Sequence, residues 1–164
     1  MMIPPEDIVR IAEKREDKNL RFRTWLKNHA DPDDLDERFK VLHEELFPGY
    51  DCCECGNCCR MYRTTVEDEE IGTIAAFLSM PVEKFKNDFL VETDRGRAFP
   101  APCPMLQEDG KCRIYEVRPE ECRGFPYTDK PERLWSLYGM MEYAGMCPVT
   151  YEIVERLKQS YGFR

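Results

Sequence analysis

The pattern of apolar and polar positions predicts helices in the first third of the chain. Apolar residues are sparse from about Glu6 to Asn28 and charges fill the gaps, which indicates one long polar surface helix or two shorter ones. A further helix is predicted to start at Asp31-Pro32, with the aspartate as N-cap and the proline at the first helical position. Its apolar residues recur at steps of four and three until Pro48-Gly49 ends it.

Beyond residue 59 the pattern predicts short elements. The expected elements are a strand at 61–65, a helix opening at Thr65, a helix at 81–88, strands at 89–93 and 98–99, a hairpin turn at 108–111, a short helix opened by Pro119, and a last helix opened by Cys147-Pro148. We therefore expect a small α+β fold that is mostly helical, with short strands, a hairpin and irregular loops. The predicted domains are a helical lead-in at residues 1–48 and a cysteine-rich domain at residues 49–164.

The charge and the apolar content of the chain limit which kinds of partner and which cellular compartment we expect. The 164 residues include 24 Lys and Arg against 32 Asp and Glu, a net charge of −8, which argues against a nucleic-acid partner. No uncharged apolar run is long enough to cross a bilayer, so no membrane role is expected. The first residues lack the basic and apolar segments of a signal peptide, and we therefore expect a cytoplasmic protein.

Five of the nine cysteines lie between Cys52 and Cys59, and four of them follow the spacing C-x2-C-x2-C-C. Overlapping CxxC units let thiolates close on one centre, and Gly56 supplies the backbone freedom for the tight turn between them. We expect this segment to be a loop. In a secreted protein nine cysteines would suggest four disulfides and a spare, but in a reducing cytoplasm this density indicates metal or redox chemistry.

Several separated motifs resemble the CxxCxxCC family of zinc- or iron-chelating cysteine-cluster proteins, which are bacterial. The matching segments, in the order of the family, are Cys52-x2-Cys55-Gly56-Asn57-Cys58-Cys59, Cys103-Pro104-Met105-Leu106, Gly110-Lys111-Cys112-Arg113-Ile114-Tyr115, Arg118-Pro119-x2-Cys122-Arg123-x-Phe125-Pro126 and Cys147-Pro148. The resemblance leaves out the residues before Pro48. A flagellin lysine N-methylase that looks like an iron–sulfur protein is among the relatives of this family.

The resemblance implies a set of eight thiolate ligands. These are Cys52, Cys55, Cys58, Cys59, Cys103, Cys112, Cys122 and Cys147. Cys53 is extra to the family pattern. It alternates with Cys52 and is expected to point away from the site, so we expect it to be dispensable. By the same alternation, Cys58 and Cys59 are expected to serve different metals or to bridge two.

Arginines lie beside these cysteines in an otherwise acidic chain. Arg118 and Arg123 bracket Cys122, and we expect them to form an outer layer that donates hydrogen bonds to the sulfurs. The alternative is that Arg123 pairs with Glu120 at the surface, at the i,i+3 spacing.

Both zinc and an iron–sulfur cluster fit thiolate ligands. Structural zinc sites usually combine two CxxC-like hairpins, whereas the later cysteines here are isolated. Three cysteines at C-x2-C-x2-C with a remote Cys-Pro are closer to ligation of a [4Fe–4S] cluster, although Cys59 follows Cys58 directly. The spacing thus favours iron–sulfur and leaves zinc open.

The function expected first is a metal-binding protein whose iron–sulfur cluster or zinc is structural or carries electrons, and whose surface recognises another protein. Catalysis is expected less, because no Gly-rich cofactor loop or nucleophile motif is visible. The alternatives are an iron–sulfur-dependent methyltransferase or redox enzyme, which the flagellin methylase relative implies, and a metal storage or delivery protein.

Overall fold

The computed structural model describes residues 2–164, which divide into two compact units. The cysteine unit spans Asp51–Phe125. The helical unit combines the residues up to Tyr50 with Pro126–Arg164. The fold is mostly helical with a small two-stranded antiparallel sheet, so the expected α+β class is confirmed. Among residues 2–164 there is no helix of the length and apolarity that a membrane crossing needs.

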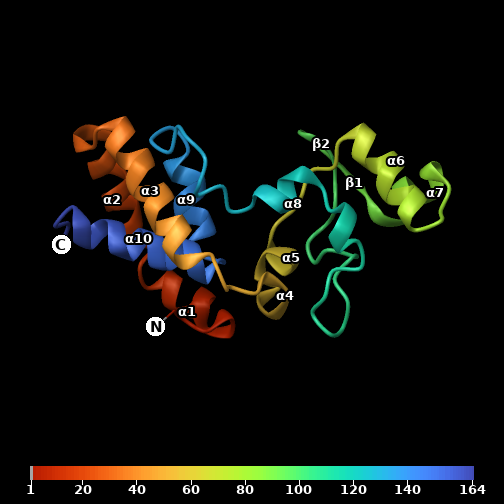
Figure 1. Ribbon diagram of the computed structural model, residues 1–164, viewed down its shortest axis with the longest axis horizontal. Helices are drawn as coiled ribbons and strands as arrows, with labels where there is room; N and C mark the ends of the chain where they lie inside the picture. Colours follow the sequence, from red (N-terminus) through yellow and green to blue (C-terminus); the bar gives the residue numbers. More distant parts are fainter. Residues whose placement is uncertain (1) are drawn as a thin grey trace. The chain divides into compact units, whose positions relative to one another are not determined.

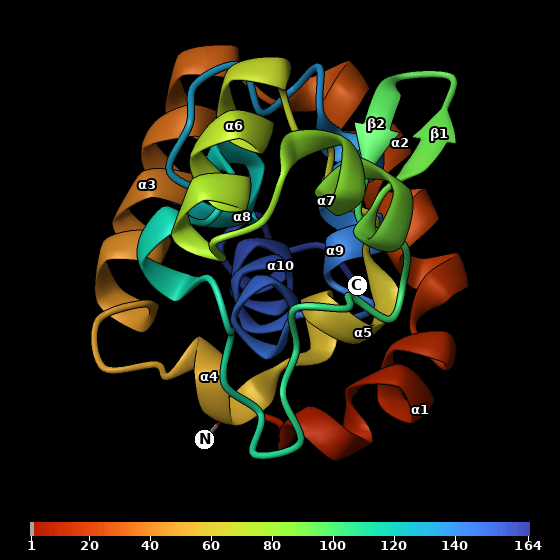
Figure 2. The same cartoon turned by 90° about the vertical axis from the view of Figure 1, so that its right-hand side faces the viewer.

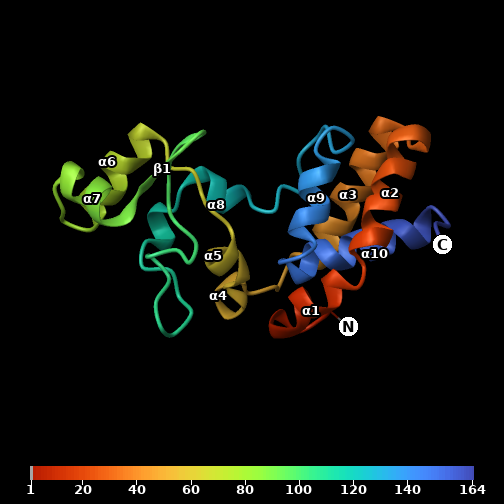
Figure 3. The same ribbon diagram turned by 180° about the vertical axis from the view of Figure 1, so that it is seen from behind.

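The helical unit is built from two distant parts of the chain. Its elements are η1 (Pro5–Asp7), α1 (Ile8–Glu13), α2 (Glu16–His29), α3 (Pro32–Leu46), α9 (Leu137–Tyr143) and α10 (Pro148–Ser160). Helix α10 packs on α3, and α2 packs on α9, as seen from the front and from behind in Figures 1 and 3. The two helices predicted in the lead-in are present, and α3 starts as expected. The side chain of Asp31 accepts hydrogen bonds from the backbone amides of Asp33 and Asp34 at 3.1 and 3.0 Å.

A fully buried apolar core joins the two parts of the helical unit. From the first part it contains Ile8, Phe22, Leu26, Leu35 and Phe39, and from the second Leu137, Val149, Ile153 and Leu157. Each such side chain contributes about 1.5–3 kcal/mol of burial free energy. This packing is why residues 126–164 group with the N-terminal helices, whereas the sequence-based division assigned them to the cysteine domain.

Polar contacts fix the loop that leads into α9. The carboxylate of Asp36 on α3 accepts hydrogen bonds from the amides of Glu132 (2.7 Å) and Arg133 (2.8 Å). A hydrogen bond of 2.8 Å joins His43 Nδ1 to the buried hydroxyl of Thr128. The buried Arg133 donates to the carbonyls of Tyr127 and Pro131. These contacts attach the returning chain to α3.

The cysteine unit consists of short elements. They are α4 (Cys52–Cys55), α5 (Asn57–Met61), α6 (Asp68–Phe77), α7 (Val82–Phe89), β1 (Val91–Thr93), β2 (Gly96–Ala98), η2 (Tyr115–Val117) and α8 (Glu120–Gly124). Strands β1 and β2 form an antiparallel pair in which Val91 faces Ala98, and Figure 2 shows their arrows side by side. The expected strand at 61–65 is reduced to a single bridge between Thr65 and Ala98.

One apolar cluster supports the cysteine unit. Its buried members are Val66, Ile71, Ile74, Ala75, Phe85, Phe99, Met105 and Ile114. The rings of Phe85 and Phe99 meet edge to face with 6.2 Å between centroids. Cys103 and Cys112 pack against this cluster. The core of α6 and α7 therefore reaches directly to two of the predicted metal ligands.

Two local expectations are wrong. The Cys52–Cys59 segment is not a loop but two helical turns, α4 and α5, joined at Gly56 in a left-handed conformation with φ of 63°. The alternation argument for neighbouring cysteines requires an extended backbone, so it does not apply in these turns. Helix α6 begins after Glu67, not at Thr65. Its start is a capping box in which Glu67 and Glu70 bind each other's backbone amides.

Candidate metal centre

Seven cysteines line one pocket of about 90 Å³ in the cysteine unit: Cys52, Cys53, Cys58, Cys59, Cys103, Cys112 and Cys122. The other lining residues are mostly apolar or aromatic and include Phe99, Met105, Ile114 and Phe125, with Arg118 as the charged member. Segments far apart in sequence thus bring their thiols to one place. The structure does this for six of the eight predicted ligands.

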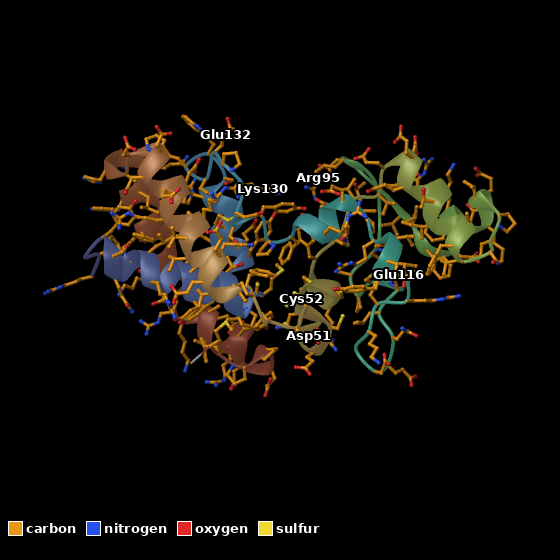
Figure 4. All side chains as sticks on the ribbon, viewed as in Figure 1. Asp51, Cys52, Arg95, Glu116, Lys130 and Glu132 are labelled. Carbon is orange, nitrogen blue, oxygen red and sulfur yellow. The ribbon has the colours of Figure 1, made fainter. Side chains whose placement is uncertain are left out.

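Helices α4 and α5 supply the first four of these thiols. The carboxylate of Asp51 accepts a hydrogen bond of 2.8 Å from the amide of Cys53 and so caps α4. Figure 4 marks Asp51 and Cys52 at the start of this helix. At its end the amide of Gly56 donates to the carbonyl of Cys52 at 2.9 Å. The two caps keep α4 to a single turn and reverse the chain into α5.

The segment from Cys103 to Cys112 is joined to α4 and α5 through the backbone. The amide of Cys103 donates to the carbonyl of Cys59 at 2.7 Å. The expected hairpin turn is present, since Leu106 and Cys112 form an antiparallel bridge. At its tip Gly110 has φ of 84°, and a Cβ there would lie 3.0 Å from the carbonyl oxygen of Cys53. The hairpin therefore packs closely on α4.

Helix α8 brings Cys122 to the pocket, where its thiol donates to the hydroxyl of Thr64 at 3.4 Å. Two carboxylates hold this helix. Glu121 accepts hydrogen bonds from the hydroxyl of Tyr62 (2.9 Å) and from the amide of Thr65, and Glu70 accepts one of 2.7 Å from the amide of Glu120. No local spacing in the sequence indicates the roles of Thr64 and Glu121, because their partners lie more than fifty residues away.

The electrostatics of the thiols differ within the pocket. Burial raises the pKa of Cys103 to about 12 and that of Cys122 to about 11, and it also raises the pKa of Cys112. In contrast, a hydrogen bond from Cys58 lowers the pKa of Cys59 to about 7, assisted by the charges of Arg60 and Arg118.

The two predicted arginines have different surroundings. Arg118 lines the pocket, and its guanidinium carbon lies 3.7 Å from the centroid of the Tyr115 ring while its Nε donates to the Tyr115 carbonyl at 3.0 Å. Arg123 makes two hydrogen bonds to a carboxylate oxygen of Glu120, of 2.9 and 3.2 Å, in an exposed pair. The contacts of Arg123 in the structure are thus those of the alternative stated above, in which Arg123 pairs with Glu120 at the surface.

Two predicted ligands do not line the pocket. Cys55, at the end of α4, is half-buried outside the lining, and its carbonyl accepts a hydrogen bond from Arg60 at 3.0 Å. Cys147 belongs to the helical unit, where it is buried directly before α10. Cys53 lies in the lining instead, although it was expected to point away. The roles of Cys55 and Cys147 as ligands stay predictions.

The donor set fits a thiophilic metal. The pocket presents sulfur and apolar groups, and its lining holds no carboxylate or imidazole. Thiolates suit zinc and iron–sulfur clusters, whereas calcium and magnesium need oxygen ligands. Within residues 2–164, no three His, Cys, Asp or Glu side chains are already arranged as a coordination sphere. The thiols share the lining of one pocket without forming such a sphere.

Comparisons with known proteins agree with this chemistry. Residues 51–147 match the family model CxxCxxCC, described as "Putative zinc- or iron-chelating domain". A curated protein of Methanocaldococcus jannaschii, "Uncharacterized protein MJ0661", is 32% identical over 87 residues. That match covers 48% of this chain and 45% of the relative, so the chain spans about half the length of the curated relative. No solved structure matches the chain. With its thiol pocket inside the matched segment, this chain belongs to the CxxCxxCC family of zinc- or iron-chelating domains.

Proposed function

We propose that the cysteine unit holds an iron–sulfur cluster on the thiolates of its pocket, and that the cluster is structural or carries electrons to or from a protein partner. The observation that carries this proposal is the convergence of seven thiols on one apolar pocket of about 90 Å³. One water molecule needs about 10–15 Å³ by a similar measure, so the pocket has room for a group of several atoms.

The ligands of the cluster would be drawn from the six predicted cysteines that line the pocket: Cys52, Cys58, Cys59, Cys103, Cys112 and Cys122. A four-iron cluster takes four of them. When bound, the cluster would supply a redox centre whose potential depends on burial and on hydrogen bonds to sulfur. The apolar residues around the thiols would exclude water from it. Arg118 would place a positive charge beside the sulfurs, as predicted, and its stacking on Tyr115 would keep that charge in position.

Metal binding is expected to be coupled to the order of this unit. Burial keeps the thiols of Cys103 and Cys122 protonated near neutral pH, because their pKa values are raised to about 12 and about 11. A bound metal would replace these protons and neutralise the thiolates that form. The segments around the pocket are short turns, so a metal that links them would stabilise their arrangement.

Zinc is the second candidate, and the geometry of α4 and α5 favours it. Cys52 and Cys55 are the first and last residues of the single turn α4, which the left-handed Gly56 follows, and this matches the short C-x2-C spacing of structural zinc sites; of the two, only Cys52 lines the pocket. A zinc-bound chain would be colourless and redox-inactive.

The full chain, purified without oxygen and without added metal, decides between these candidates. An iron–sulfur cluster predicts iron and acid-labile sulfide in equal amounts, together with a broad visible absorption band that bleaches on reduction. Stoichiometric zinc without visible absorption would establish the zinc site instead. A chain that retains neither metal, and gains neither on reconstitution under reducing conditions, would refute the proposed function.

A further inference from the structure

Cys53 is the thiol that the family spacing does not include. It nevertheless lines the same pocket as Cys59 and Cys112. Its neighbour Cys55 offers a comparison within one helical turn, because both side chains are half-buried and only Cys53 belongs to the lining. The extra cysteine is therefore placed among the other thiols and not at an unrelated surface.

Two backbone contacts define the position of Cys53. Its amide is held by the carboxylate of Asp51 at 2.8 Å, which fixes the first turn of α4. Its carbonyl oxygen faces Gly110 so closely that a Cβ added to this glycine would lie 3.0 Å from the oxygen. Cys112 follows Gly110 by two residues and is tied to Leu106 across the hairpin. The close approach at Gly110 thus sets α4 against the hairpin turn that leads to Cys112.

The pocket also holds more thiols than one metal centre needs. Seven thiols line it, which is more than one four-coordinate ion or one four-iron cluster binds. Some of the thiols in the pocket are therefore surplus to a single four-thiolate centre.

We propose that Cys53 and Cys112 bind one metal ion together, as a pair of thiolate ligands contributed by α4 and by the hairpin. This inference rests on the proposed function, since it assigns ligands within the same pocket. Each thiol releases its proton to the solvent as its sulfur–metal bond forms, and no electron transfer is needed. Cys53 thereby becomes a ligand of this chain that the family spacing alone does not reveal.

The test compares metal content in the full chain purified anaerobically. The variants are Cys53→Ser, Cys112→Ser and the double variant, with Glu54→Gln as the matched control at an exposed position of the same helical turn. Elemental analysis and native mass spectrometry give the metal bound per chain. The two single variants should lose the same amount of metal, the double variant should lose no more than either one, and Glu54→Gln should keep the metal content of the wild type. Such non-additivity is expected when two residues act on one ion.

A second measurement on the wild type does not depend on the folding of a variant. In the metal-loaded chain, alkylation mapped by mass spectrometry should spare Cys53 and Cys112, and removal of the metal should expose both together. Full metal content in Cys53→Ser, or alkylation of Cys53 in the loaded chain, would overturn the pairing and leave the proposed function standing. Absence of metal from the wild type would overturn both.

Discussion

Removal of the Arg118 side chain should weaken metal retention. In Arg118→Gln the hydrogen bond of 3.0 Å to the Tyr115 carbonyl and the stacking at 3.7 Å on the Tyr115 ring are both lost. A hydrogen bond contributes about 1 kcal/mol and a cation–π contact about 0.5–1 kcal/mol, so the sum approaches about 2 kcal/mol. These contacts hold the guanidinium in the pocket lining, and loss of a residue beside metal ligands typically lowers metal affinity by about 10–100-fold, so we expect a fall near the lower end, about 10–30-fold.

Arg123→Gln is the matched control, because it removes the same charge five residues further along the chain. Its pair with Glu120 is exposed on both sides, at 48% and 77%, and such pairs contribute about 0.5 kcal/mol. We therefore expect a change of about twofold or less. Arg118→Lys separates charge from stacking, because lysine keeps the charge but loses the planar contact.

Competition against a chelator, followed over time under anaerobic conditions, measures retention in all three variants and the wild type. If the metal is an iron–sulfur cluster, Arg118→Gln should also lower its reduction potential, because a positive charge beside the cluster favours the reduced form. Equal retention in Arg118→Gln and Arg123→Gln, with unshifted potentials, would refute the role of Arg118.

Three further predictions concern stability. Phe85→Ala should destabilise the cysteine unit by about 3–5 kcal/mol in urea unfolding, because Phe85 is a fully buried member of its apolar cluster. A loss below about 1 kcal/mol would contradict this packing. Burial raises the pKa of Tyr161 from 10.0 to about 12, so the folded state holds this proton at pH values where the unfolded chain has lost it. The free energy of unfolding should therefore fall between pH 10 and 12 in the wild type and fall less in Tyr161→Phe. Parallel pH profiles of the two proteins would contradict the raised pKa of Tyr161. Metal removal under reducing conditions should make residues 51–125 sensitive to proteases while the helical unit keeps its helicity, and unchanged protease resistance would show that metal and order are not coupled.

Local signals in the sequence predicted much of the fold. The cap at Asp31, the β1–β2 return and the helix after Cys147 all depend on residues within a few positions of one another. The division of the chain was different, because α3 packs on a helix more than a hundred residues later and no local pattern indicates such a partner. Helix α9 was not expected either, since Gly139 interrupts its short apolar pattern.

The candidate site shows the same limit. The resemblance to the family pointed to six of the seven thiols that line the pocket. The error about Cys53 arose from a wrong backbone assumption, because alternation between neighbours holds in a strand and not in the helical turn of α4. The sequence also did not distinguish Arg118 from Arg123. The difference lies in their contacts, because Arg123 pairs with the carboxylate of Glu120 whereas Arg118 stacks on the ring of Tyr115.

The discontinuous helical unit has a consequence for folding. During synthesis the whole cysteine unit emerges before α9 and α10 are made. Helix α3 can therefore pack on α10 only after residues 51–125 have been synthesised. Closing a flexible loop of that length costs about 4 kcal/mol in the simple chain-closure relation. Cys52 and Phe125, near the entry and the exit of this insertion, line the same pocket. A metal that orders the pocket would therefore hold the two ends of the loop together before α3 and α10 pack. Removal of the metal would then add the entropic cost of closing this loop to the packing of α3 on α10, although neither helix contains a ligand of the pocket.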